Sequence, residues 1–306
     1  MEQYNSFVSS RGLLKSCVIR NTRPVSSVAQ LDFSRYNVLS AGATLYVCQD
    51  ALGLFADHSL DTITAPFVLV SGDSDLALTE DLPGFAKILS HPLLLAWFAQ
   101  NLRARGDKLF HLPIGLDYHT AWEMTGYFEV ETISPMRQEA GFKAIIAGSK
   151  AWAERIPHAY CNWHFFLRGE RQECLEKVDP AACYFEPQRI PRQQSWRNQA
   201  EFMFTLSPEG GGMDCHRTWE GLLLGAVPIV RRNALAPLFE RLPVIIVEDW
   251  AEVTPAFLQS CAGRLATQTF DFGPLLLRHW QDRLQFRVLD DSFANLTWDQ
   301  FRGLIA

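Results

Sequence analysis

Short apolar runs alternate with helical or polar stretches along the first part of the chain. Each run ends near glycine, aspartate or asparagine, which is typical of a buried β-strand. The expected strands are Thr44–Cys48, Pro66–Ser71, Ala96–Gln100 and Leu109–Ile114. Because buried strands separated by helices must be covered on both faces, the pattern predicts an α/β layer structure.

A second α/β set is expected after a helix that begins at Ser134-Pro135 and ends near Lys150, since a capping serine before proline is a strong helix start. Its expected strands are His158–Leu167, Cys183–Glu186, Phe202–Ser207, Pro228–Arg231 and Val244–Val247. Later helices are expected from Thr254-Pro255, over Gly273–Arg287, and from Asp291 onwards. The sequence therefore predicts two α/β domains, residues 1–135 and 136–290, and a C-terminal helix over 291–306 that can return to the first domain.

Composition narrows the class of protein. The 306 residues are 48% hydrophobic and 20% charged, which excludes a disordered chain. The net charge of −6 argues against broad electrostatic binding of nucleic acid or anionic lipid. No apolar stretch approaches the ~20 residues that span a bilayer, and seven scattered cysteines without a CxxC pair indicate reduced thiols. We expect a soluble, cytoplasmic protein with a small-molecule partner and no transmembrane segment.

One segment, residues 204–230, combines glycines with charged residues: FTLSPEGGGMDCHRTWEGLLLGAVPIV. The pattern predicts a strand, a glycine loop, a helix, a tight turn and a second strand. Glycines 210–212 allow a ligand to approach the backbone closely. Asp214 is expected to cap the helix, whose N-terminus then favours an anion.

The polar residues on this helix indicate what the anion is. His216, Arg217 and Glu220 are expected to share one polar face beside an apolar stripe. Arginine can hold a phosphate through two hydrogen bonds, and glutamate can accept two from a sugar diol, so the group predicts a nucleotide diphosphate site. An ordinary surface pair of Arg217 and Glu220 is the alternative. Neither the P-loop nor the dinucleotide-binding spacing is present.

The same segment resembles the C-terminal, nucleotide-sugar-binding half of exostosin-like glycosyltransferases. The likeness is carried by SPEG, the glycine loop, Asp-x-His-Arg-x-Trp-Glu and GAVPIV, with Tyr160-Cys-Asn162 and LPVIIVEDW as flanks. It covers about residues 158–250 and is weaker in the N-terminal half. The resemblance implies a GT-B fold, in which two Rossmann-like domains face each other across a cleft and the C-terminal one holds most of the donor.

The resemblance also implies residue roles. Arg217 and His216 would neutralise the diphosphate, and Glu220 would hold the ribose or sugar hydroxyls. The glycine loop and Glu209 would lie against the transferred sugar, and Arg168 would be a second phosphate contact or a solvated loop arginine. The expected donor-binding residues are therefore Arg168, Glu209, Gly210, Gly211, Gly212, Asp214, His216, Arg217 and Glu220.

Sugar transfer also needs a base for the acceptor hydroxyl. Asp73 is the first candidate and Asp75 the second, because both follow a buried strand and ligands gather at the carboxyl ends of strands. A turn with helix-capping aspartates is the alternative. Asp73-Ser74-Asp75 also spells a DxD motif that could hold Mn²⁺ or Mg²⁺ on a sugar diphosphate, which keeps a metal-dependent enzyme open.

Asp117 and His119 form a second polar cluster in this half, expected on the acceptor side unless Asp117 caps the next helix. With the resemblance to exostosin-like enzymes, these residues predict a glycosyltransferase (a hexosyl- or pentosyltransferase) of glycan biosynthesis. It would move a sugar from a nucleotide-sugar, expected to be a UDP-sugar, to a carbohydrate hydroxyl, without a metal or other cofactor and with inversion through a carboxylate base. A non-catalytic sugar- or nucleotide-binding protein and a hydrolase or phosphorylase on a related fold remain alternatives.

Overall fold

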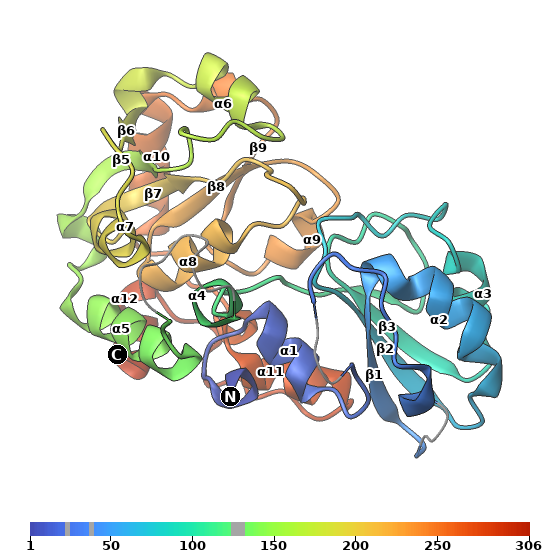
Figure 1. Ribbon diagram of the computed structural model, residues 1–306. Coiled ribbons are helices and arrows are strands. Elements are labelled where there is room, and N and C mark those ends of the chain that lie inside the picture. The colour runs from blue at the N-terminus through green and yellow to red at the C-terminus, as the bar shows by residue number, and fades with distance from the viewer. Residues whose placement is uncertain (22–24, 37–39, 124–131) are drawn as a thin grey trace.

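The computed structural model describes residues 1–21, 25–36, 40–123 and 132–306 and contains two parallel β-sheets. They form separate lobes in Figure 1. The first sheet has the order β1-β2-β3-β4, with strands Ala43–Cys48, Phe67–Gly72, Leu94–Ala99 and Leu109–His111. The second has the order β6-β5-β7-β8-β9, where β5 to β9 are Ile156–Cys161, Cys183–Phe185, Phe202–Leu206, Val227–Arg231 and Ile245–Val247. The α/β prediction is confirmed.

Each expected strand is present, but two end earlier than the sequence predicts. β4 ends at His111 instead of Ile114, just before Pro113, which has no N–H to continue a ladder. β5 ends at Cys161 instead of Leu167. There the chain turns across the sheet, and Trp163 Nε1 donates to the carbonyl oxygen of Leu206 at 2.9 Å. Aromatic residues 163–166 looked like strand in sequence but belong to a loop.

Helices cover both faces of each sheet. The first sheet lies between α2 and α3 on one face and α1 and α11 on the other, and the second between α6 and α10 on one face and α5, α7 and α8 on the other. Short 3₁₀ turns occur at Glu2–Tyr4, Phe33–Arg35, Gln49–Ala51, Leu60–Thr62, Trp152–Glu154, Pro180–Ala182, Trp250–Glu252 and Gly273–Leu275. The α-helices α1 to α12 span Ser10–Ser16, Leu52–His58, Phe85–Leu89, His119–Glu123, Pro135–Gly148, Arg171–Lys177, Arg192–Gln199, His216–Leu224, Ala236–Phe239, Pro255–Leu265, Leu277–Leu284 and Trp298–Ile305. Within the described ranges, no helix is long and apolar enough to cross a membrane.

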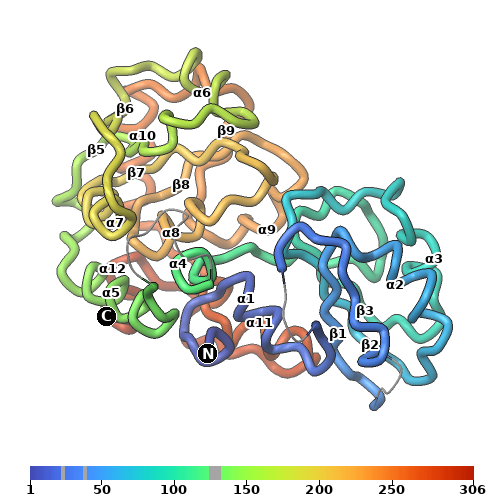
Figure 2. The backbone as a smooth tube through the Cα atoms, in the orientation of Figure 1, coloured from blue at the N-terminus to red at the C-terminus, as the bar shows by residue number. Residues whose placement is uncertain are grey.

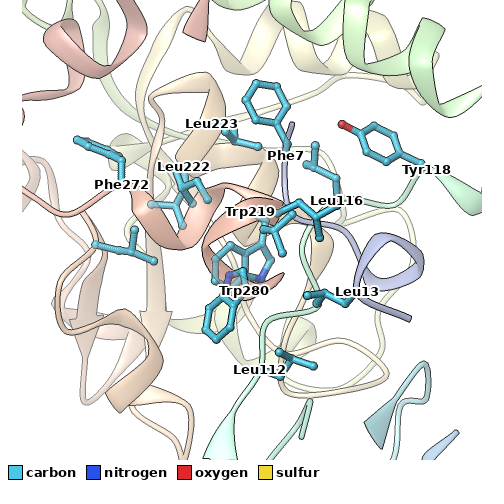
Figure 3. Packing of buried hydrophobic residues seen from close by; sticks show 14 of the residues in the cluster. Phe7, Leu13, Leu112, Leu116, Tyr118, Trp219, Leu222, Leu223, Phe272 and Trp280 are labelled. Carbon is cyan, nitrogen blue, oxygen red and sulfur yellow. The ribbon is translucent and has the colours of Figure 1, made fainter. Parts of the chain in front are cut away.

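One buried cluster is shared by the two sheets. Figure 3 shows Trp219 from α8 and Trp280 from α11 packed beside Leu13 and Leu116 of the N-terminal half. Trp219 and Trp280 are 0% and 1% exposed. The cluster reaches β2 through Val68 and Val70, while the alternate residues of that strand face a second core under α2 and α3. The two halves are therefore joined by apolar packing as well as by the chain.

The N-terminal segment lies beside α11, although the two are far apart in sequence (Figures 1 and 2). Val8 N–H donates to the carbonyl of Leu275 and Leu277 N–H to that of Ser6, each at 2.9 Å. The single helix expected over Gly273–Arg287 is wrong: Leu276 between the 3₁₀ turn and α11 is extended and pairs with Phe7.

The C-terminal helix α12 packs on α5, and its Trp298 fills the space beside Gly225. The segment that runs beside the start of the chain is α11, within residues 136–290. A return of residues 291–306 to the first domain stays a prediction. The helix predicted at Ser134-Pro135 is confirmed, and Ser134 accepts a hydrogen bond from Arg137 N–H as its N-cap. The exact domain boundaries stay a prediction.

Candidate functional site

The strand order points to a site in the second sheet. Its order reverses between β5 and β7, since β6 lies on one side of β5 and β7 to β9 lie on the other. Open parallel sheets bind ligands at the carboxyl ends of their strands, at such a reversal. Asn162 and Ser207 are the residues that directly follow β5 and β7. The first sheet follows chain order through all its described strands.

A cavity of about 570 Å³ opens beside this reversal, and we call it the β5 pocket. It is lined by Asp117, Asn162, Arg192, Ser195, His216 and Glu220, among others. His216 and Glu220 lie one turn apart on α8 and face the pocket together, as predicted. Asn162 donates a hydrogen bond to Ser195, which joins the end of β5 to α7. The pocket therefore combines an imidazole, carboxylates, an amide and a guanidinium.

Arg217 does not share the face of His216 and Glu220, and this part of the prediction is wrong. Consecutive helical residues point about 100° apart. Arg217 Nη1 donates to Ser207 Oγ at 3.3 Å and to the carbonyl oxygen of Pro208 at 3.1 Å. Its guanidinium lies 5.8 Å from the centre of the Trp163 ring. Arg217 thus lies at the end of β7, beside the start of the glycine loop.

A second arginine, which sequence reasoning missed, lies close to Arg217. Burial lowers the pKa of Arg171 to about 10, and the positive charge of Arg217 acts in the same direction. Arg171 Nη1 donates to the carbonyl oxygen of Phe166 at 2.8 Å, and its Nε is buried without a partner in the described chain. A Cβ at Gly210 would lie 3.0 Å from Arg171 Nη2. Two guanidiniums therefore flank the glycine loop, an arrangement suited to an anion.

Asp214 connects the two halves instead of capping α8, whose N-cap is Cys215. One carboxylate oxygen accepts from Ile114 N–H and the other from Trp219 Nε1, both at 2.8 Å. Burial raises the pKa of Asp214 to about 6. The predicted capping role is wrong because the carboxylate bonds to the Trp219 side chain and to the loop after β4, and Cys215 takes the N-cap position.

The glycine loop lies against the carboxyl ends of β2 and β3. Asn101 Oδ1 accepts from Asp214 N–H at 2.8 Å, and Asn101 Nδ2 donates to the carbonyl oxygen of Ser74 at 3.0 Å. A Cβ at Gly212 would lie 2.8 Å from Asn101 Nδ2, and one at Gly211 would lie 2.1 Å from Asp75 Oδ2. The glycines are required by this close approach between the halves.

Arg168 and Glu209 border the same loop. Arg168 forms an ion pair with Asp75 at 3.2 Å, with both side chains more than half exposed. The pair joins the loop after β5 to the loop after β2. Glu209 Oε1 accepts from Asn233 Nδ2 at 2.8 Å, and Glu209 N–H donates to Glu170 at 3.1 Å. Both predicted residues therefore lie at the edge of the loop that the arginines flank.

Asp73 is buried in the N-terminal half. Ser26 Oγ donates to Asp73 Oδ1 at 2.7 Å, and Arg11 lies 3.3 Å from Oδ2, with Arg11 and Asp73 each 3% exposed. The backbone of Asp73 is left-handed, with φ of 58°, a strained conformation for a non-glycine residue. Burial raises the pKa of Asp73, whereas Arg11 and Ser26 act in the opposite direction. This aspartate is held in place by a fixed set of partners.

Asp73 and Asp75 differ in their surroundings, since each is paired with a different arginine. In the part of the chain that the structure describes, no group of three or more His, Cys, Asp or Glu side chains is arranged to hold a metal ion.

Asp117 and His119 lie together at the start of α4. Asp117 accepts from Thr120 N–H at 3.0 Å, as expected for a helix cap, and from Arg192 Nη2 at 3.0 Å. Burial alone would raise the pKa of Asp117, but His216, Arg192 and His119 outweigh it and hold the pKa well below its usual range. Burial lowers the pKa of His119 to about 4. Asp117 therefore lies at the boundary between the halves as a carboxylate.

A smaller cavity of about 110 Å³ lies on the N-terminal side of His216, and we call it the serine pocket. Its lining includes Ser10, Ser26, Asp73, Asp75, His119 and His216. Hydroxyls, carboxylates and imidazoles are groups that hydrogen-bond to polyols. The structure thus brings the acceptor-side prediction His119 together with both aspartates of the Asp73-Ser74-Asp75 motif.

No protein-family model matches the chain, and no curated protein matches it either. The function is therefore inferred from the residues of the site.

Proposed function

We propose that this protein is a GT-B-type glycosyltransferase that transfers a sugar from a nucleotide-sugar to a hydroxyl of a carbohydrate acceptor. The observation that carries the proposal is the reversal of strand order between β5 and β7. Beside it lie a pocket with a carboxylate and a loop flanked by two guanidiniums. Opposite it lie the carboxyl ends of β2 and β3. A nucleotide diphosphate and an acceptor would meet between these two edges.

In this proposal the nucleoside occupies the β5 pocket. Glu220 accepts hydrogen bonds from the ribose hydroxyls, because a carboxylate can accept two from a vicinal diol. Asn162 and Ser195 lie on the same wall and offer an amide and a hydroxyl to the base. The resemblance to exostosin-like enzymes implies that this nucleotide is UDP. The diphosphate would then extend along α8 toward the glycine loop.

The leaving diphosphate needs compensating charge as its bond to the sugar breaks. Arg217 and Arg171 are the proposed source, supported by the hydrogen bond of Arg217 to Ser207 before the loop and by the position of Arg171 beside Gly210. Backbone N–H groups of the loop add further donors. Guanidiniums and amides that are already in place need little reorganisation during the reaction, which favours transfer without a metal ion.

The proposal is tested by incubating the protein with UDP-, GDP-, CDP- and ADP-sugars in the presence of simple saccharides and measuring release of the nucleoside diphosphate. Slow release without acceptor and faster release with one are the expected result for a transferase. Tight nucleotide binding with no release would indicate a binding protein instead. Release that does not respond to any saccharide would favour a hydrolase, and no binding of any nucleotide would reject the proposal.

A further inference from the structure

His216 is the residue that lines both described cavities of the site. It faces the β5 pocket with Glu220 and the serine pocket with Asp73 and His119. The two cavities thus meet at one imidazole near the N-terminus of α8. If the donor lies in the first cavity, an acceptor in the second would approach it past this ring. The side chain at that junction is therefore placed for contact with the reacting atoms.

The orientation of the imidazole fixes which nitrogen can take a proton. His216 Nδ1 lies 2.7 Å from the carbonyl oxygen of Gly115. A carbonyl can only accept a hydrogen bond, so Nδ1 carries the hydrogen and the lone pair of the neutral ring is on Nε2. In the described parts of the chain, Nε2 has no hydrogen-bond partner. The ring is thus set as a proton acceptor.

The carbonyl that holds the ring is itself fixed. Gly115 has φ of +64°, and a Cβ there would lie 2.4 Å from the carbonyl oxygen of Val8. Leu116 N–H donates to that same oxygen at 2.8 Å. Only glycine fits this turn, so the backbone that orients His216 belongs to the N-terminal half. The imidazole is therefore oriented by a carbonyl of the N-terminal half, whereas the backbone of His216 belongs to the C-terminal half.

Asp73, the carboxylate predicted as the base, is less available. Its Oδ1 accepts from Ser26 and its Oδ2 faces Arg11, and both side chains of that ion pair are 3% exposed. Proton transfer to Asp73 would discharge a buried ion pair, which carries a desolvation cost. Asp73 is better suited to hold an acceptor hydroxyl in place than to remove its proton.

We propose that His216 is the general base of the transfer and that the serine pocket receives the hydroxylated acceptor. In this step the acceptor oxygen forms a bond to the anomeric carbon and its proton moves to His216 Nε2. The bond between that carbon and the diphosphate oxygen breaks, and its electron pair leaves with the diphosphate. This inference rests on the proposed function and replaces Asp73 by His216 as the base.

The groups around the ring stabilise the imidazolium that forms. Asp117, Asp73 and Asp214 each interact electrostatically with His216 from different elements. His119, whose ring centre lies 6.2 Å away, opposes them only if it is protonated, and burial lowers its pKa to about 4. Asp117 is itself bound to Arg192.

The test is His216→Asn, because the asparagine amide can still donate to the carbonyl of Gly115 but cannot accept a proton. Binding of UDP, GDP, CDP and ADP is measured by calorimetry, and turnover as release of nucleoside diphosphate from the matching sugar nucleotide with mixed saccharides. We expect the variant to bind the nucleotide within threefold of wild type and to turn over at least about 100-fold more slowly, the usual contribution of a general base. The matched control His58→Asn, at an exposed position on α2, leaves both values unchanged.

A second variant separates chemistry from packing. In His216→Gly, added imidazole is expected to restore turnover at least tenfold, which a purely structural defect would not permit. Turnover of His216→Asn within threefold of wild type, or a loss of turnover matched by an equal loss of nucleotide binding, would overturn the assignment. If Asp73→Asn, and not His216→Asn, showed this loss of turnover with nucleotide binding retained, Asp73 would be the base. If wild-type protein neither binds nor turns over any donor, the proposed function fails, and this inference fails with it.

Discussion

Both sheets are parallel and are covered by helices on both faces, but they differ in strand order. The first runs β1-β2-β3-β4 in chain order, whereas the second reverses between β5 and β7. The pocket with Glu220 and the loop flanked by arginines both lie at that reversal. The first sheet contributes the facing wall, through the loops after β2 and β3. Fold class alone does not locate a site of this kind; strand order does.

The halves also differ in how their charges are balanced. In the N-terminal half, the buried carboxylate of Asp73 is matched by Arg11. In the C-terminal half, Arg171 and Arg217 bond to carbonyl and hydroxyl oxygens, with no ion pair to either in the described structure. The charge of Asp73 is thus matched by a cation, whereas Arg171 and Arg217 carry positive charge that an anion can neutralise. This contrast supports the proposal that the second half binds the donor.

The largest expected effect tests that assignment. Arg217→Ala should lower turnover by about 100- to 1,000-fold, because the leaving diphosphate would lose a positioned donor. Arg232→Ala is the matched control, since Arg232 is exposed and paired with Glu248 outside the site. Steady-state release of nucleoside diphosphate measures both variants. Equal activity of Arg217→Ala and wild type would remove the distinction between the halves.

Asp214 and His119, at the boundary between the halves, are expected to change the free energy of unfolding in opposite directions as the pH changes. Burial raises the pKa of Asp214 from 3.8 to about 6. At a pH between these two values, the folded protein holds a proton on this carboxyl group and the unfolded chain does not. This contribution to stability is present at low pH and is lost as pH rises through 6. Burial lowers the pKa of His119 from 6.5 to about 4, so its contribution has the opposite sign and is lost as pH falls toward 4.

Urea unfolding at pH 7 and pH 4.5 separates the two groups. Relative to wild type, Asp214→Asn should lose about 2 kcal/mol of unfolding free energy on acidification, and His119→Gln should gain about 2 kcal/mol. The wild-type protein should show little change from these two groups because they nearly cancel. Parallel pH profiles for wild type and both variants would contradict the burial of these side chains.

Two substitutions in the glycine loop are expected to lower the free energy of unfolding by different amounts, so each serves as a comparison for the other. In Gly212→Ala the new Cβ meets Asn101, which is buried and bonded to both Ser74 and Asp214, so we expect a loss of about 1–3 kcal/mol from overpacking. In Gly211→Ala the Cβ meets the exposed end of Asp75, which can rotate away, so the loss should stay below about 1 kcal/mol. Chemical denaturation measures both, and the reverse order would contradict the described contact between the halves.

Sequence patterning was sufficient for the elements whose signals are local. The apolar run of β2 and the cap at Ser134 were predicted because neighbouring residues alone determine them. The break at Leu276 was not, because it depends on pairing with Phe7 at the far end of the chain. The site, too, depends in part on contacts between residues that are far apart in the sequence.

Helical spacing placed His216 and Glu220 on one face correctly but not Arg217. The side chain of Arg217 follows the end of β7, which a helical wheel does not contain. Arg171 was missed because it approaches Gly210 only in the folded chain. Its position three residues after Arg168 was the available signal. Asp214 was taken for a cap because its partner Ile114 lies 100 residues away.

The smallest effect concerns the exposed pair that crosses between the halves. Asp75→Asn removes the ion pair with Arg168, and since both side chains are more than half exposed, the unfolding free energy should change by less than about 0.5 kcal/mol. Nucleotide binding by Asp75→Asn should equal that of wild type with and without Mn²⁺. A loss of Mn²⁺-dependent binding in this variant would favour the metal-dependent alternative.

The most direct test of the central claim is a calorimetric titration of wild-type protein and Glu220→Ala with UDP, GDP, CDP and ADP, with and without Mn²⁺. The claim is that the site beside the reversal of strand order between β5 and β7 binds a nucleotide diphosphate without a metal ion. It predicts that wild type binds one nucleotide family equally well in both conditions and that Glu220→Ala weakens this binding at least tenfold. Binding that requires Mn²⁺ and is unchanged in Glu220→Ala, or no binding of any nucleotide, would contradict it.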